Sequence, residues 1–214
     1  MTKQKIKQAI VNGVAEAGLT VNGSLNLTHT RITELPVGLR VSGSLYLQNC
    51  VRIASLPTGL NVGGSLDLLN CTRIRELPAD MKVGGSLYLQ GTDITELPAG
   101  LKIWGSLDLR GTAITQLPSD LKVGGDLYLN NTGITELPED LNVGESLWLT
   151  GCTDITALPA GLVVGKSLYL DDCVRITQLP ADLKVGDSLY LDGTGVNEVP
   201  TSLRVGAKAY LFGV

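Results

Sequence analysis

The chain has 214 residues, of which 43% are hydrophobic and 18% are charged, with a formal net charge of -4 and a pI near 5.0. This acidic balance gives no electrostatic basis for nucleic acid or an anionic membrane as the main partner. No run of about 18 apolar residues is present, so the sequence predicts no membrane span.

The first residues predict a helix over residues 4–17, because apolar side chains recur there at helical spacing and Gly18 comes next as a stop signal. We interpret residues 1–18 as an N-terminal cap that covers the apolar end of the remaining chain. An amphipathic helix on a membrane surface or partner is the alternative. The basic start is soon interrupted by polar residues and makes a poor secretory signal, so we expect a cytoplasmic protein or one secreted without a cleavable signal peptide. The apolar helical positions are Ile6, Ala9, Ile10, Val14 and Ala17.

Residues 19–214 consist of about ten copies of one unit of 20 or 21 residues, seen clearly in residues 83–102. A fixed period of this size predicts a solenoid, because no single unit can bury its apolar side alone. All nine prolines fall at one phase of the unit, after a Leu or Val: Pro36, Pro57, Pro78, Pro98, Pro118, Pro138, Pro159, Pro180 and Pro200.

Each unit contains a short stretch with the alternation of a strand. In residues 86–90 this alternation directs Leu87 and Leu89 into the core and Ser86, Tyr88 and Gln90 toward solvent.

The rest of the unit predicts a corner before the strand and a return leg after it. Glycine pairs such as Gly84-Gly85 predict a tight corner that requires positive φ or a close backbone approach. Pro98 disfavours helix at Leu97, so the return leg should be extended or polyproline-like. We expect the charges at two phases of this leg, exemplified by Glu96 and Lys102, to be solvated.

The four cysteines all occur in 21-residue units, where the 20-residue units have threonine. Both residue types suit a small side chain buried beneath a turn. We favour free thiols for the pairs Cys50/Cys71 and Cys152/Cys173. A disulfide is the alternative, because adjacent strands are only about 4.8 Å apart, but stacked equivalent positions have parallel Cβ directions that suit it badly.

The pattern Leu-x-Leu-x-x-(Thr or Cys)-x-Ile-x-x-Leu-Pro-x-x-Leu resembles the leucine-rich repeat, and in particular the short Leu-Pro class of bacterial YopM and IpaH type effectors. The resemblance implies an α/β solenoid with a parallel concave β-sheet, a convex side without full helices, and a scaffold that binds proteins. It also implies an effector or host-interaction role. Nothing carries over from the ubiquitin-ligase domain of IpaH proteins. Self-association through a sheet edge is a further expectation.

One outward column of the predicted sheet is rich in Tyr and Trp, which either stabilise the sheet by stacking or form an interface; the two interpretations are compatible. Acidic residues beside its C-terminal half favour a basic protein partner. The alternative is a glycan, stacked on the same rings. We therefore predict a non-enzymatic binding scaffold. The candidate partner-binding residues are Tyr88, Tyr128, Trp148, Tyr169, Tyr190, Asp171 and Asp192.

Catalytic chemistry has little support in the sequence. The single histidine, His29, lies in a turn without clustered acids near it in sequence, and we interpret it as a turn residue. Two thiols without histidine are weak zinc ligands. We predict no enzyme activity, no cofactor and no metal.

Overall fold

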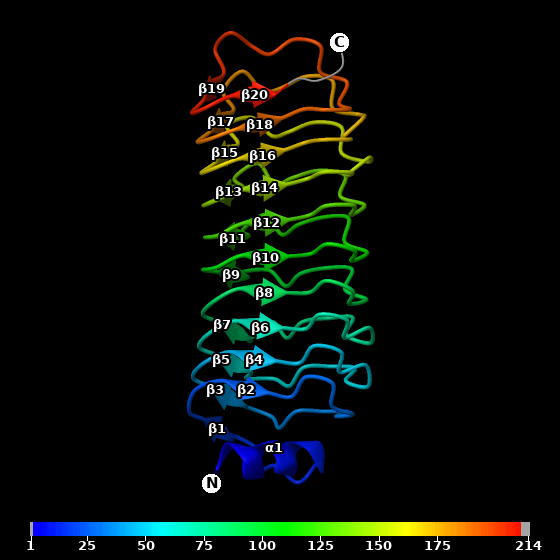
Figure 1. Ribbon diagram of the computed structural model, residues 1–214, viewed down its shortest axis with the longest axis vertical. Coiled ribbons are helices and arrows are strands. Elements are labelled where there is room, and N and C mark those ends of the chain that lie inside the picture. The colour runs from blue at the N-terminus through cyan, green and yellow to red at the C-terminus, as the bar shows by residue number, and fades with distance from the viewer. Residues whose placement is uncertain (1, 211–214) are drawn as a thin grey trace.

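The computed structural model describes residues 2–210 and shows a parallel β-solenoid of stacked coils with one short helix at its N-terminal end (Figure 1). The predicted repeat solenoid with a parallel sheet is confirmed. The end of the predicted solenoid, residues 211–214, lies outside the described part of the chain.

Every coil contributes two strands of two residues, joined by a corner of three residues. The second of them, predicted as the core strand, forms one continuous ten-stranded parallel sheet, here called the second strand column. Its members are β2 (Leu25–Asn26), β4 (Leu45–Tyr46), β6 (Leu66–Asp67), β8 (Leu87–Tyr88), β10 (Leu107–Asp108), β12 (Leu127–Tyr128), β14 (Leu147–Trp148), β16 (Leu168–Tyr169), β18 (Leu189–Tyr190) and β20 (Ala209–Tyr210).

The other strand of each coil belongs to a first strand column, in the part of the unit that the sequence predicted as an extended or polyproline-like return leg. Lys102 and Ile103, for example, form a strand with the lysine exposed and the isoleucine buried. The members are β1 (Thr20–Val21), β3 (Arg40–Val41), β5 (Asn61–Val62), β7 (Lys82–Val83), β9 (Lys102–Ile103), β11 (Lys122–Val123), β13 (Asn142–Val143), β15 (Val163–Val164), β17 (Lys184–Val185) and β19 (Arg204–Val205).

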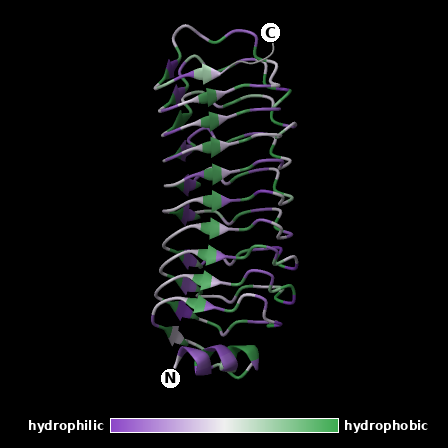
Figure 2. Cartoon of the chain, viewed as in Figure 1, coloured by the Kyte–Doolittle hydropathy of each residue, from purple (hydrophilic) through white to green (hydrophobic). Residues whose placement is uncertain are grey.

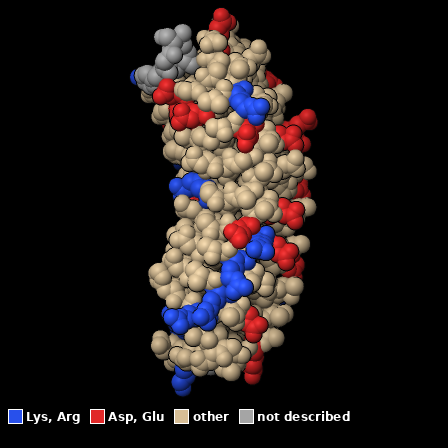
Figure 3. Space-filling model, turned by 90° about the vertical axis from the view of Figure 1, so that its right-hand side faces the viewer, with Lys and Arg blue, Asp and Glu red and all other residues tan. Residues whose placement is uncertain are grey.

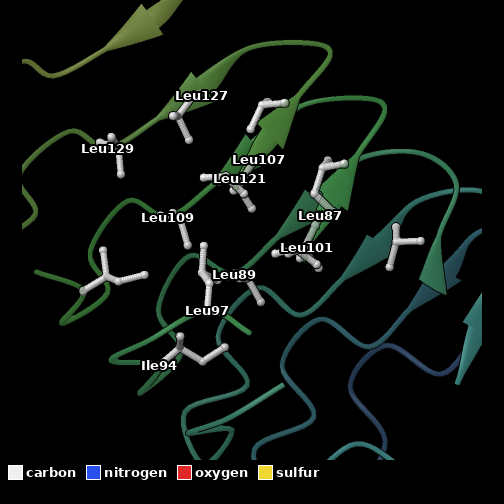
Figure 4. Close-up of a cluster of buried hydrophobic side chains, with 14 of the residues drawn as sticks. Leu87, Leu89, Ile94, Leu97, Leu101, Leu107, Leu109, Leu121, Leu127 and Leu129 are labelled. Atoms are coloured by element: carbon white, nitrogen blue, oxygen red, sulfur yellow. The ribbon is translucent and has the colours of Figure 1, made fainter. Parts of the chain in front are cut away.

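The core runs through the stack as rows of equivalent apolar side chains. Leu87 and Leu89 are 0% exposed, as predicted, and Leu87 lies in register with Leu66 and Leu107 of the neighbouring coils. Ile94, Leu97 and Leu101 of the same coil complete the apolar interior, with their side chains directed into the space between the strands (Figure 4). In Figure 2 the strands of the second column are green, and so hydrophobic, where they begin, which is the position of Leu87 in β8. Burial of these side chains in every coil supplies the main stabilisation.

The corner glycines allow a close approach of the backbones, one of the two alternatives that the glycine pairs predicted. A Cβ built on Gly84 would lie 2.3 Å from the carbonyl oxygen of Gly63, and one on Gly63 would lie 2.4 Å from that of Ser42. The glycine pairs do not have positive φ. Because real Cβ atoms do not approach an oxygen so closely, a side chain at this corner requires the coils to move apart.

One coil carries a large side chain at this corner, and there the first strand column is interrupted. Trp104 occupies the position of Gly84 and Gly124, and 76% of its surface is exposed. Gly124 N–H donates to Ile103 O at 2.8 Å, but no equivalent bond joins Trp104 N–H to Val83 O. The column is therefore divided into a four-stranded sheet ending at β7 and a six-stranded sheet beginning at β9.

The substitution Trp104→Gly should join these two sheets. With the Cβ removed, the coil can settle at the spacing of its neighbours, and the amide of residue 104 should bond Val83 O. We expect at least tenfold slower hydrogen exchange of this amide, measured by NMR. Trp104→Ala is the matched control, because it keeps the Cβ and should leave the exchange fast. Equal slowing in both variants would show that the indole, and not the Cβ, keeps the sheets apart.

A ladder of side-chain hydrogen bonds runs along the same corner. Ser65 Oγ accepts from Ser86 N–H at 3.1 Å, and Ser86 Oγ accepts from Ser106 N–H at 3.0 Å. Asp126 continues the ladder with its carboxylate, which accepts from Ser146 N–H at 2.9 Å. The sequence predicted Ser86 to face solvent; the residue is half-buried, and its hydroxyl accepts a hydrogen bond within the stack.

The turn after each second-column strand from β2 to β18 places one residue in the left-handed region. The φ values are 58° at His29, Asn49 and Asn70, and 69° at Gly91. Glycine and asparagine tolerate this conformation better than other residues. His29 is thus a turn residue, as predicted.

The threonines and cysteines lie beneath this turn, as expected from their alternation. Thr92 Oγ1 donates to Leu89 O of its own coil at 2.7 Å, whereas Cys71 Sγ donates to Leu47 O of the preceding coil at 3.0 Å. All four cysteines are buried and free, in agreement with the favoured interpretation. The same carbonyl-directed bonds recur at Thr30, Thr112, Thr132, Thr194, Cys50, Cys152 and Cys173.

The N-terminal helix α1 (Lys3–Val11) covers the end of the first coil and buries Ile6 and Ile10. The prediction of a helix over residues 4–17 was too long. Gly13 adopts φ +69°, a conformation typical of the residue just beyond a helix end, so the last two apolar positions fall outside the helix.

No helix within residues 2–210 is long and apolar enough to cross a membrane.

Candidate partner-binding face

The outward residues of the second strand column form a continuous stack of five rings in the C-terminal half. Ring centroids are 5.8 Å apart for Tyr128–Trp148, 3.6 Å for Trp148–Tyr169, 4.5 Å for Tyr169–Tyr190 and 4.9 Å for Tyr190–Tyr210. The last three pairs are nearly parallel, with interplanar angles of 6–9°. We call these five residues the aromatic stack. The strand register produces it, because parallel pairing places equivalent residues of successive coils above one another.

These rings are half-buried, so the expectation that their side chains point freely to solvent was wrong. Trp148, Tyr169 and Tyr190 each lie between two stacked rings, so neighbouring rings cover both of their faces. Burial is the main cause of the raised pKa of Tyr128 and of Tyr169. The Trp148 Nε1–H is buried without a hydrogen-bond partner, so packing between rings fixes the orientation of the indole.

Tyr88 does not belong to the aromatic stack. Its neighbours in the column are Asp67 and Asp108, whose side chains are buried beside it. The N-terminal half of the face therefore alternates rings with carboxylates. The column in the sequence contained this alternation, but the burial of the two aspartates was not predicted.

Asp108 holds a cation of the chain itself. Arg110 Nε and Nη2 donate to its two carboxylate oxygens at 2.9 and 2.6 Å, and the guanidinium lies 5.1 Å from the Tyr128 ring centroid. The hydrogen bond to Asp108 is the main cause of the raised pKa of Arg110. Sequence reasoning missed this cluster, although an Asp two residues before an Arg on an alternating strand was a usable signal.

The C-terminal half of the face also carries an acidic cluster beside the aromatic stack. Asp171 Oδ1 accepts from Asp192 N–H at 3.2 Å, and Asp172 N–H donates to Asp192 O at 2.7 Å. Burial is the main cause of the raised pKa of Asp171, and the charges of Asp192 and Asp172 add to it. The structure thus brings Asp171 and Asp192 together, as two of the predicted site residues.

Charge is distributed unevenly along the turn side of the solenoid. Figure 3 shows a band of basic residues across the half nearer the N-terminus, whereas acidic groups lie along the whole length of this side. Two ion pairs join turns of successive coils, Arg75–Asp93 at 3.7 Å and Arg175–Asp154 at 3.6 Å. These pairs are exposed and contribute little to stability.

The buried thiols are the other titratable groups of interest. Burial raises the pKa of Cys71 and of Cys173 to about 12 and also raises the pKa of Cys152. Such thiols stay protonated near neutral pH and are poor nucleophiles. Within residues 2–210 no group of three or more His, Cys, Asp or Glu side chains is placed to hold a metal ion.

The fold and this face define the chain as a parallel β-solenoid repeat protein with an aromatic and acidic strip along one sheet. Comparison with known proteins finds no matching family model, curated protein or solved structure.

Proposed function

We propose that the chain is a non-enzymatic scaffold that binds a protein partner through the outward face of the second strand column. The aromatic stack carries this proposal. Its five half-exposed rings form a rigid amphipathic strip, and Tyr and Trp are enriched among the residues that dominate binding energy at protein interfaces.

The chemistry beside the stack favours a basic partner. Asp171 and Asp192 add negative charge next to Tyr169 and Tyr190. Complementary charge accelerates the encounter of two proteins and selects against acidic competitors.

The arrangement of the rings supports a protein partner over the glycan alternative. Sugars stack on open ring faces, but the faces of Trp148, Tyr169 and Tyr190 are covered by their neighbours at 3.6–4.9 Å. The edges that remain, with phenol hydroxyls, suit the irregular polar and apolar surface of a protein.

The resemblance of the repeat to leucine-rich repeats of the short bacterial Leu-Pro class extends this proposal. On that basis the partner is a host protein and the chain acts as an effector through its repeats.

The test is the double variant Trp148→Ala/Tyr169→Ala, compared with the wild type in a pull-down from host-cell lysate and then by calorimetry with the captured partner. We expect affinity to fall by about a hundredfold or more, since anchors at an interface centre contribute several kcal/mol. Trp104→Ala is the matched control, because it removes an exposed aromatic from the corner next to the first strand column, away from the proposed face. Unchanged affinity in the double variant would exclude the aromatic stack as the site.

The double variant also removes three stacked ring pairs, which contribute roughly 0.5–1.5 kcal/mol each to stability. We therefore expect it to lower the free energy of unfolding about as much as replacing a buried leucine by alanine. A variant that preserves the stack separates binding from folding. Tyr169→Phe/Tyr190→Phe removes only the hydroxyl groups and should weaken binding without changing the melt. Asp171→Asn/Asp192→Asn should mainly slow association, and this effect should shrink as salt is raised.

A further inference from the structure

The N-terminal half of the same face contains two equivalent acidic positions, and only one of them holds a cation. The column runs Tyr46, Asp67, Tyr88, Asp108, Tyr128 in strict parallel register. Each aspartate therefore lies between a tyrosine of the coil below and a tyrosine of the coil above.

At the second position, Asp108, the cation is the Arg110 side chain of the same coil. Arg110 makes a two-pronged contact with the Asp108 carboxylate, and its guanidinium also lies over the Tyr128 ring. Asp108 is 3% exposed beneath this cation. In this fold, a carboxylate placed between two tyrosines therefore accepts a guanidinium group.

At the first position the residue that corresponds to Arg110 is Leu69. The Asp67 carboxylate accepts only from Leu69 N–H at 3.0 Å and from Gln48 Nε2. No Lys or Arg in the described part of the chain lies within ion-pair distance of Asp67, which is 9% exposed. A buried carboxylate without a cation is costly, and half of its acceptor capacity is unused.

A cation that binds Asp67 would displace the side-chain amide of Gln48, which donates to this carboxylate. Gln90 is its equivalent one site further along, and no hydrogen bond joins the Gln90 side chain to Asp108, where Arg110 is bound. The glutamine thus bonds the carboxylate only at the position without a cation.

We propose that Tyr46, Asp67 and Tyr88 form a slot that binds the guanidinium group of an arginine side chain on the partner protein. The flanking tyrosines are two strand spacings apart, roughly 9.6 Å, which accommodates one planar group between them. A planar guanidinium stacks on aromatic faces and donates two parallel hydrogen bonds to a carboxylate, whereas an ammonium is a point charge without this planar fork. This partner chemistry rests on the proposed function of the face.

The slot is tested with a small probe, so that no partner is needed. N-acetyl-arginine amide is titrated into the whole chain and followed by NMR at the Leu69 amide and the Tyr46 and Tyr88 rings. We expect saturable shifts at these groups, at least tenfold weaker binding of the lysine analogue, and no binding of the uncharged citrulline analogue. Shifts that do not saturate, or equal binding of arginine and citrulline, would overturn the proposal.

Two variants exchange the local residues of the two positions. Leu69→Arg should fill the slot from within, as Arg110 does beside Asp108, and abolish the shifts. Arg110→Leu should open the second position, so that the probe saturates two sites in place of one. Each variant copies an arrangement already present in the fold, and Asp67→Asn gives a further loss-of-binding variant. Probe binding that persists in Leu69→Arg, or a single site in Arg110→Leu, would contradict the assignment.

The outcomes separate this inference from the proposed function. If the aromatic double variant loses partner binding but the probe does not bind, the slot is refuted and the proposed interface at the aromatic stack stands. Probe binding at Asp67 together with an unaffected partner in the aromatic double variant would instead refute the proposed interface at the aromatic stack and leave the slot.

Discussion

Replacing Leu87 by alanine should lower the free energy of unfolding by about 2–5 kcal/mol. Leu87 is 0% exposed and packs against the equivalent leucines of the coils below and above, Leu66 and Leu107. The cavity would be lined by three coils held together by the continuous hydrogen-bond ladder of the second strand column, so it cannot collapse locally. Urea unfolding monitored by circular dichroism measures the loss.

The matched control for this prediction is Leu69→Ala, which removes the same atoms from a half-exposed leucine on the outward face. We expect a loss below about 1 kcal/mol there, closer to a surface substitution. A loss at Leu87 no larger than at Leu69 would contradict the assignment of the core.

Alkaline pH should destabilise the fold through the buried thiols. The pKa of Cys71 and of Cys173 is raised from 9.0 to about 12, mainly by burial, so the folded state favours the neutral thiol. This contribution is complete below pH 9 and is lost as the pH rises toward 12, because only the unfolded chain ionises easily in that window. Between pH 8 and pH 11 the expected loss is roughly 2–3 kcal/mol for each thiol.

The double variant Cys71→Ser/Cys173→Ser isolates this effect from the titration of lysine and tyrosine. Serine keeps a small group able to donate to the same carbonyl oxygens and does not ionise in this range. Urea unfolding at pH 8, 10 and 11 should give a steeper decline for the wild type than for the variant. Parallel declines would show that the thiols do not control alkaline stability.

The architecture was predictable because it depends on distances along the chain. The period of 20–21 residues determines the coil, and alternation within residues 86–90 was sufficient to place Leu87 and Leu89 in the core. The start of the chain also predicted its helix. The position where that helix ends was not predicted, because Gly13 interrupts an apolar pattern that continues to residue 17.

The pairing of the first strand column was not predicted from the sequence. The alternation in Leu101-Lys102-Ile103 was visible, and the sequence predicted an extended or polyproline-like return leg there, but it did not predict a paired strand. A strand of two residues has almost no intrinsic stability and forms only when the next coil supplies its partner.

The sequence by itself therefore determined the repeat, the core positions and the aromatic and acidic residues of the face. The tertiary structure decided which of these residues touch. The stack from Tyr128 to Tyr210, the placement of Asp67 and Asp108 between tyrosines and the gap at Trp104 all involve neighbours 20 or 21 residues apart. The reason is physical: the short rise between coils brings equivalent residues together, so each side chain's burial depends on the residue above and below it and not on its neighbours in the chain.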